Sequence, residues 1–143
     1  MEKTYVAKKE DIKRGCYLVD AQGKILGRLA SKVASILKGK NRPYYTPNID
    51  TGDAVIVINA AKIKVTGRKL KDKIYRSHSG YPGGLKLASL ETMLKKNPSR
   101  VIRLAIKRML PDTSLGNKIL KKLKIYNDDK HPHQAQNPEV LEV

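Results

Sequence analysis

Apolar residues near the start of the chain predict a strand followed by a helix. Residues 17–20, Tyr-Leu-Val-Asp, form a short apolar run typical of a strand, and a turn follows at residues 21–23. Apolar residues then recur at helical spacing, with Lys and Arg on the opposite face. Gly39 stands where such a helix would end in a left-handed turn, and Pro43 agrees with an end there. The apolar face consists of Leu26, Leu29, Ala30, Val33, Ala34 and Leu37.

The next apolar segment, residues 54–58, is an unbroken run of Ala-Val-Ile-Val-Ile. A run without polar alternation is typical of a strand covered on both faces, as in a parallel sheet. Strand, helix and buried strand together predict a βαβ unit, and therefore an α/β fold. Residues 63–86 differ, because 63–66 alternate and 77–84 are rich in glycine, which predicts a mostly extended, solvent-facing segment.

Helical patterns dominate the last third of the chain. Ser89 is a plausible N-cap for a helix that runs to Asn97. Pro98 then begins a second helix, which stops before Pro111, and Ser114 can cap a third over residues 115–123. The expected inward positions are Val101, Ile102, Ala105 and Met109 in the second helix, and Leu115, Ile119, Leu120 and Leu123 in the third.

The end of the chain predicts a short last strand at residues 124–126 and then an extended tail. Residues 127–143 contain two prolines and little periodicity, so this tail should run over the surface. A chain of 143 residues is enough for one core. We therefore expect a single domain over residues 1–143, with an N-terminal extension at 1–15.

The net charge of the chain indicates what kind of partner it binds. The net charge is +17, from 30 Lys and Arg against 13 Asp and Glu, and both halves of the chain are basic. With 40% hydrophobic residues the chain is not a disordered polycation. A folded body with this much positive charge needs a polyanion to neutralise its self-repulsion, most simply the phosphates of a nucleic acid.

Cysteine usage and the first residues bear on location. Cys16 is the single cysteine, which excludes an internal disulfide and a multi-cysteine zinc site and favours a reducing compartment. Its apolar neighbours suggest a small buried residue rather than a nucleophile. The start lacks the apolar stretch of a signal peptide, and no apolar run could span a bilayer. We expect the protein to stay in the compartment where it is made.

The candidate RNA-binding residues are basic loops interleaved with aromatics. Cationic side chains neutralise phosphates, Tyr and His stack on unpaired bases, and glycines let the backbone approach the sugar-phosphate chain. A single surface Lys is more often merely solvated, so the prediction depends on the whole group. The first loop contributes Lys38, Lys40, Arg42, Tyr44 and Tyr45. The second contributes Arg68, Lys69, Lys71, Lys73, Tyr75, Arg76, His78, Tyr81 and Lys86.

A further set of cations lies on predicted helices. Lys118, Lys121 and Lys122 are expected on an exposed helix face, although the helix dipole alone favours Lys near a C-terminus. Arg108 could be a phosphate contact or a helix-end charge. Arg28 completes the predicted interface.

Rival functions have weaker support. Asp20, Asp50 and Asp53 with His78 could form a magnesium-dependent nuclease site, but Asp residues beside turns more often cap backbone amides or pair with Lys. His131-Pro-His133 is half a metal site without a third ligand nearby. A DNA-compacting or regulatory protein fits the charge, but the sequence contains no helix-turn-helix or dimer seam. We expect no catalysis, metal, cofactor or small-molecule substrate.

Several segments together resemble bacterial and plastid large-subunit ribosomal protein thirteen over nearly the full chain. They are Tyr17-Leu-Val-Asp-Ala21, Leu26-Gly-Arg-Leu-Ala30, Asp50-Thr-Gly-Asp53, Tyr75-Arg-Ser-His-Ser-Gly80, Ile106-Lys-Arg-Met-Leu-Pro111 and Lys121-Lys-Leu-Lys-Ile-Tyr126. The departures are small: Cys16 replaces a frequent Trp, Asn48 a frequent His and Arg108 a common Gly.

The resemblance implies a three-layer α/β/α fold around a mostly parallel four-stranded sheet. It also implies a structural place in the large ribosomal subunit, in contact with 23S-type rRNA and neighbouring ribosomal proteins, early in subunit assembly. The expected location is the cytoplasm, or the plastid stroma for an organellar source. The rRNA helices contacted, the protein neighbours, the bacterial or plastid origin and any regulatory role stay open.

Overall fold

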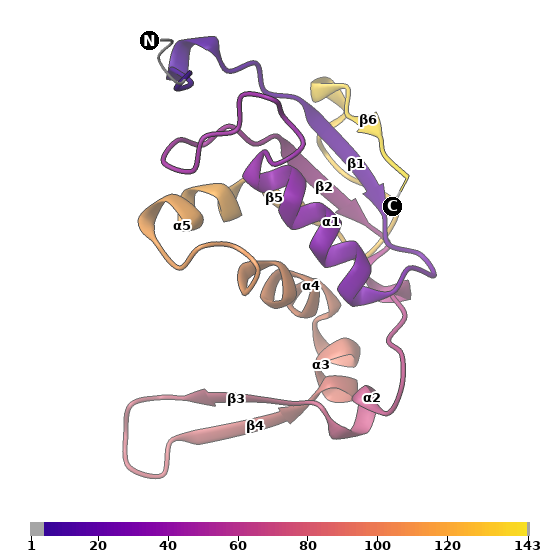
Figure 1. Ribbon diagram of the computed structural model, residues 1–143. Helices are drawn as coiled ribbons and strands as arrows, with labels where there is room; N and C mark the ends of the chain where they lie inside the picture. The colour runs from indigo at the N-terminus through magenta and orange to yellow at the C-terminus, as the bar shows by residue number, and fades with distance from the viewer. Residues whose placement is uncertain (1–4, 143) are drawn as a thin grey trace.

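The computed structural model describes residues 5–142 and is an α/β structure with one parallel sheet and one separate hairpin (Figure 1). The sheet has the order β5-β2-β1-β6. All three neighbouring pairs in it are parallel. Its strands are β1 (Cys16–Asp20), β2 (Ala54–Ile58), β5 (Leu123–Ile125) and β6 (Glu139–Val140). The α/β class and the parallel four-stranded sheet are therefore confirmed.

Helix α1 (Leu26–Lys38) connects β1 to β2, as the sequence pattern predicted. Every residue of the predicted apolar face is buried, because the 3.6-residue period places all of them toward the sheet. The helix ends at Gly39, whose φ of 85° is the left-handed conformation that favours glycine. Helix and strands thus form the predicted βαβ unit.

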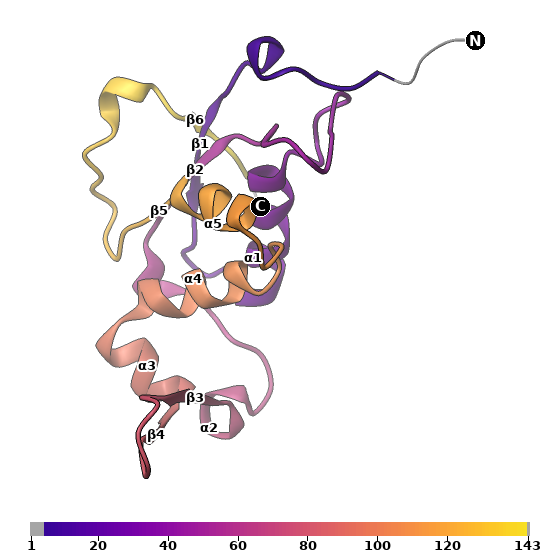
Figure 2. The same ribbon diagram turned by 90° about the vertical axis from the view of Figure 1, so that its left-hand side faces the viewer.

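Strand β2 is covered on both faces. Val55 and Val57 belong to the main core under the helices, whereas Ile56, which is only 1% exposed, faces the other side of the sheet. Figure 2 shows the C-terminal segment, with the 3₁₀ helix η3 (Gln134–Gln136), on the side of the sheet away from α1. The arrangement is consistent with the predicted three-layer α/β/α fold.

Helices α3 (Leu90–Lys96), α4 (Pro98–Lys107) and α5 (Ser114–Lys121) follow the predicted pattern, with corrections at their ends. Ser89 caps α3 as expected, by accepting a hydrogen bond from the Thr92 amide. The cap of α5 is Thr113, and Ser114 is its first residue. Met109 was predicted to point inward and is 46% exposed, because α4 ends at Lys107 and the helical period no longer directs it to the core.

Residues 69–89 form an arm that projects from the body (Figure 1). It consists of the short helix α2 (Lys69–Asp72) and an antiparallel hairpin of β3 (Ile74–His78) and β4 (Leu85–Ser89). The extended, solvent-facing character was predicted correctly, and α2 was not foreseen. Short 3₁₀ turns, η1 (Lys9–Asp11) and η2 (Ala60–Lys62), complete the described elements.

The C-terminal tail does more than run over the surface. β6 adds a parallel strand to the outer edge of β1, and the Leu141 amide donates to the Leu18 carbonyl at 2.8 Å. The Lys32 ammonium donates to the Glu142 carbonyl at 3.1 Å. Residues 1–4 of the predicted extension and residue 143 of the predicted tail lie outside the described residues. Within residues 5–142, no helix has both the length and the apolar character to cross a membrane.

Candidate nucleic-acid interface

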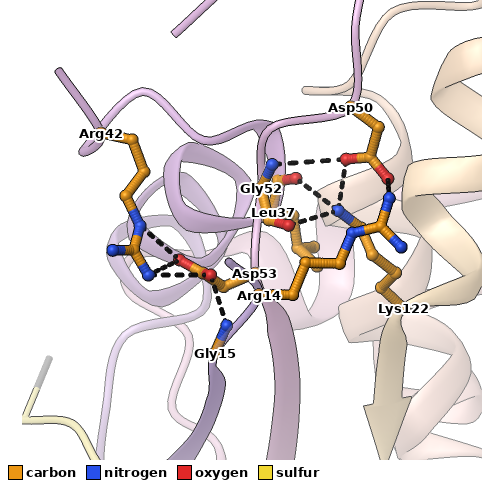
Figure 3. Close-up of polar contacts among 8 residues, drawn as sticks. All are labelled: Arg14, Gly15, Leu37, Arg42, Asp50, Gly52, Asp53 and Lys122. Atoms are coloured by element: carbon orange, nitrogen blue, oxygen red, sulfur yellow. Dashed lines mark hydrogen bonds and ion pairs between the residues drawn. The ribbon is translucent and has the colours of Figure 1, made fainter. Parts of the chain in front are cut away.

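The loop between α1 and β2, residues 39–53, is fixed by an ion pair between Arg42 and Asp53 (Figure 3). The Asp53 side chain is fully buried. The Arg42 Nε donates to its Oδ2 at 3.1 Å, and Nη2 donates to its Oδ1 at 3.0 Å. The Gly15 amide donates to the same carboxylate at 2.8 Å. Hydrogen bonding to Asp53 raises the pKa of the Arg42 guanidinium, so this side chain stays charged at neutral pH.

A second clamp joins the same loop to the end of α5. The Lys122 Nζ donates to the Asp50 carboxylate and, at 2.9 Å, to the Gly52 carbonyl (Figure 3). Arg14 approaches the other Asp50 oxygen at 3.8 Å. Burial lowers the pKa of Lys122, and the hydrogen bond with Asp50 opposes that shift. This clamp connects segments 72 residues apart in sequence.

These clamps change the predicted interface at two positions. Lys122 was expected on an exposed helix face, and this is wrong: its side chain is 15% exposed and turned toward Asp50, because it follows the last residue of α5. Arg42 is 29% exposed and directed at Asp53. Both cations therefore hold the loop in shape, whereas the neighbouring Lys40 is exposed and Lys38 is half-buried.

The carboxylates of the rival nuclease site are not gathered. Asp20 is the last residue of β1, at one end of the sheet, whereas Asp53 precedes β2 at the opposite end. Asp20 accepts hydrogen bonds from the Gln22 amide and from Asn59 Nδ2, both at 2.9 Å, and the first of these lowers its pKa. Among residues 5–142 no group of three His, Cys, Asp or Glu side chains could hold a metal ion. Asp20, Asp50 and Asp53 each accept a hydrogen bond from a backbone amide, and Asp50 also pairs with Lys122, which confirms that these aspartates cap amides or pair with Lys.

The remaining singled-out polar groups are part of the tail packing. His133 Nε2 and the Tyr126 hydroxyl lie 2.8 Å apart, and the His131 ring stacks on the His133 ring. Cys16 is half-buried, with its sulfur 3.7 Å from Gln136 Oε1, and burial raises the pKa of its thiol. A raised pKa disfavours the reactive thiolate at neutral pH.

Cations from separate parts of the sequence meet around the exposed Met109. Lys38 and Lys40, at the end of α1, line a shallow hollow that Met109 also lines. Met109 in turn lines a neighbouring cavity with Lys69, Lys73 and Arg108. We call these five cations the basic strip; α1, the end of α4 and α2 lie on one side of the molecule in Figure 2. The strip joins part of the first predicted loop to part of the second.

The arm carries the outer part of the second predicted loop. Because opposite residues of an antiparallel pair share a face, Arg76 and His78 lie with Leu85 and Leu87 on one face of the hairpin, all of them exposed. Tyr81 at the tip is 75% exposed. Tyr75 is half-buried, burial raises its pKa, and the Lys73 ammonium lies 5.5 Å from its ring centroid.

The other predicted residues are spread over the surface. Arg28 on α1, Arg68 and Lys71 around α2, Lys86 on β4, and Lys118 and Lys121 on α5 are exposed, and Tyr44 and Tyr45 are half-buried. Sequence reasoning did not single out Arg100, Arg103 and Lys107, which form the exposed face of α4. Their spacing along a helix with a buried apolar stripe was the signal that could have found them.

Together, the fold and this surface define a basic α/β protein with chemistry suited to polyanions rather than to catalysis. A profile of the family described as Ribosomal protein L13 matches residues 14–132. The chain belongs to the ribosomal protein L13 family, whose members are structural proteins and not enzymes.

Relatives in this family match the chain from end to end. It is 60% identical over 141 residues to a protein of Aquifex aeolicus, which covers 99% of this chain and 98% of the relative. It is 56% identical over 143 residues to one of Symbiobacterium thermophilum, covering all of both, and 60% identical over 139 residues to one of Pelobacter propionicus, covering 97% and 98%. All three are named large ribosomal subunit protein uL13.

Proposed function

We propose that this protein is a structural constituent of the large ribosomal subunit that binds and stabilises folded 23S-type rRNA, early in subunit assembly. The observation that carries the proposal is the basic strip, which unites cations from α1, α2 and the end of α4 beside an arm that carries Arg76, His78 and Tyr81. The names of the bacterial relatives support the same role and a location in cytoplasmic ribosomes.

Recognition is of RNA shape rather than of sequence. Lys and Arg side chains neutralise phosphates that the folding of the RNA brings together from different RNA helices. The clamped 39–53 loop keeps Lys40 in place next to Lys38, the last residue of α1. The exposed apolar residues of the arm suit contact with RNA or with neighbouring large-subunit proteins. No small-molecule substrate enters this function.

The test is the salt dependence of rRNA binding, compared between two variants of equal net charge. If about six to ten phosphates are neutralised, affinity for a large-subunit rRNA transcript falls by about 10³–10⁵ between roughly 50 and 200 mM salt. Reversing Arg68, Lys69 and Lys71 to Glu should flatten this dependence and impair incorporation into subunits. The control variant reverses the exposed Lys24, Lys62 and Lys64.

If both variants lost rRNA affinity equally, the loss would follow from net charge alone. The proposed binding surface would then be contradicted. Salt-independent binding by the unaltered protein would contradict phosphate neutralisation altogether. Early assembly is tested separately by pulse-labelling, in which the protein should appear in large-subunit precursors before most other subunit proteins. Co-sedimentation with bulk DNA instead of large subunits would favour the DNA-compacting alternative.

A further inference from the structure

A cavity of about 230 Å³ lies at the part of the basic strip formed by Lys69, Lys73 and Arg108, between the start of α1, the segment that leads into α2, and the end of α4. Its interior is apolar: Ile25, Leu26, Val65 and Leu90 line it, together with the exposed side chain of Met109. The volume is slightly below the range of about 300–1,000 Å³ that is typical of drug-sized ligands, so it suits one small ring system.

The cations of this cavity are at its edge. Lys69 and Arg108 are exposed, and Lys73 is half-buried with its ammonium 5.5 Å from the Tyr75 ring centroid. None of the described residues that line the cavity is acidic. The cavity thus combines an apolar interior with a positively charged rim.

We propose that this cavity binds a single nucleobase that is turned out of the stack of the bound RNA, with its flanking phosphates held by Lys69, Lys73 and Arg108. A nucleotide joins a planar base with apolar faces to an anionic backbone, and this combination matches the apolar interior and the cationic rim. The inference rests on the proposed RNA-binding function and identifies where an unpaired base is recognised.

Charge complementarity favours a base over the side chain of a neighbouring protein. An aliphatic side chain would fill the interior but would leave the three cations at the rim without an opposite charge. A nucleotide supplies that charge at its phosphates. An unpaired base also has two apolar faces, and burying them contributes affinity that does not depend on salt.

Substitutions that fill the cavity separate the contribution of base burial to RNA affinity from that of phosphate neutralisation. Gly27 lines the cavity and is exposed, and a Cβ built on it meets no atom within 4 Å, so Gly27→Trp introduces a large side chain without a clash at Cβ. Ala105→Met fills the same space from α4. Gly27→Ala tests loss of the glycine alone, and Gln22→Trp adds an indole to an exposed turn outside the cavity. Circular dichroism melts establish which variants are folded.

The measurement is the dissociation constant for a full-length large-subunit rRNA transcript at several salt concentrations. Gly27→Trp and Ala105→Met should weaken binding about tenfold with an unchanged salt slope, because they displace a base and no phosphate contact. The controls should bind as the unaltered protein does. Ultraviolet crosslinking of assembled subunits should join a nucleobase to Met109 or Thr66, which also lines the cavity.

Outcomes for this site differ from those for the proposed function. Normal, salt-dependent binding by both filled variants would overturn the nucleobase site and leave RNA binding intact. Crosslinks from Met109 to a neighbouring protein, with none to RNA, would assign the cavity to a protein side chain instead. Absence of rRNA binding by the unaltered protein would overturn the proposed function and this inference with it.

Discussion

The sheet body and the β3–β4 arm differ in the burial of their apolar residues. In the body, Val55, Ile56, Val57 and the inner face of α1 are almost fully buried. In the arm, Leu85 and Leu87 are more than half exposed and share a face with Arg76 and His78. A two-stranded hairpin is marginal by itself, and this one packs mainly against α2 and α3. The body is organised for stability, whereas the arm is organised for contact with something outside the chain.

A Leu→Ala substitution made in each region should give the largest difference in the free energy of unfolding. Leu29 is fully buried in α1, so Leu29→Ala should lower the free energy of unfolding by about 2–5 kcal/mol through lost burial and a cavity. Leu87→Ala removes the same atoms from a side chain that is 59% exposed, so its effect should stay below about 0.5 kcal/mol. Urea denaturation of both variants checks this, and equal costs would show that the arm is part of the stable core.

Loss of the ion pair between Arg42 and Asp53 should have the next largest effect on the stability of the body. Asp53→Asn leaves the Arg42 guanidinium, which is only 29% exposed, without its opposite charge, and should cost about 1–3 kcal/mol of unfolding free energy. Asp129→Asn in the exposed tail is the matched control and should change stability by less than about 0.5 kcal/mol. If both substitutions were neutral by thermal denaturation, the Arg42 pair would contribute little to the fold.

Charge reversal on the arm should separate stability from binding. Arg76→Glu with Lys86→Glu alters two exposed side chains, so unfolding free energy should change by about 0.5 kcal/mol or less. The slope of log affinity for rRNA against log salt should fall by about two, close to one for each lost phosphate contact. A large loss of stability with an unchanged slope would reverse the roles assigned to arm and body.

The smallest effect concerns the pH dependence of the turn after β1. Hydrogen bonding from the Gln22 amide lowers the pKa of Asp20 from its ordinary value, so the folded state favours the carboxylate. The stability it contributes is present above the unfolded pKa and is lost as pH falls through the folded pKa. Denaturation at neutral pH and near about pH 3 should show a slightly smaller acid loss for Asp20→Asn than for the unaltered protein. An NMR titration that places the Asp20 pKa above its ordinary value would contradict the assignment.

Sequence patterns were reliable where the signal is local. The inner face of α1, the end of that helix at Gly39 and the Ser89 cap each depend on residues within a few positions of one another, and all were predicted correctly. Met109 was assigned inward because the helical period was extended past Lys107, where α4 ends. The cap of α5 was misplaced by one residue, since Thr113 and Ser114 both have suitable hydroxyls.

The candidate interface was predictable in composition and less so in geometry. Most of the cations named from the sequence are exposed in the structure, but Lys122 is turned toward Asp50, and the exposed α4 residues Arg103 and Lys107 were not named. Whether a Lys faces solvent or a carboxylate depends on residues far away along the chain. Periodicity carries no information about such contacts.

The sequence by itself determined the α/β class, the βαβ unit and the basic character, because hydrophobic period and charge are properties of neighbouring residues and of composition. Tertiary structure alone decided that the tail supplies β6, that Arg42 and Lys122 serve the fold, and that Lys69, Lys73 and Arg108 share one cavity with Met109. These outcomes need contacts between segments distant in the chain, such as the 72 residues between Asp50 and Lys122, and only folding brings such segments together.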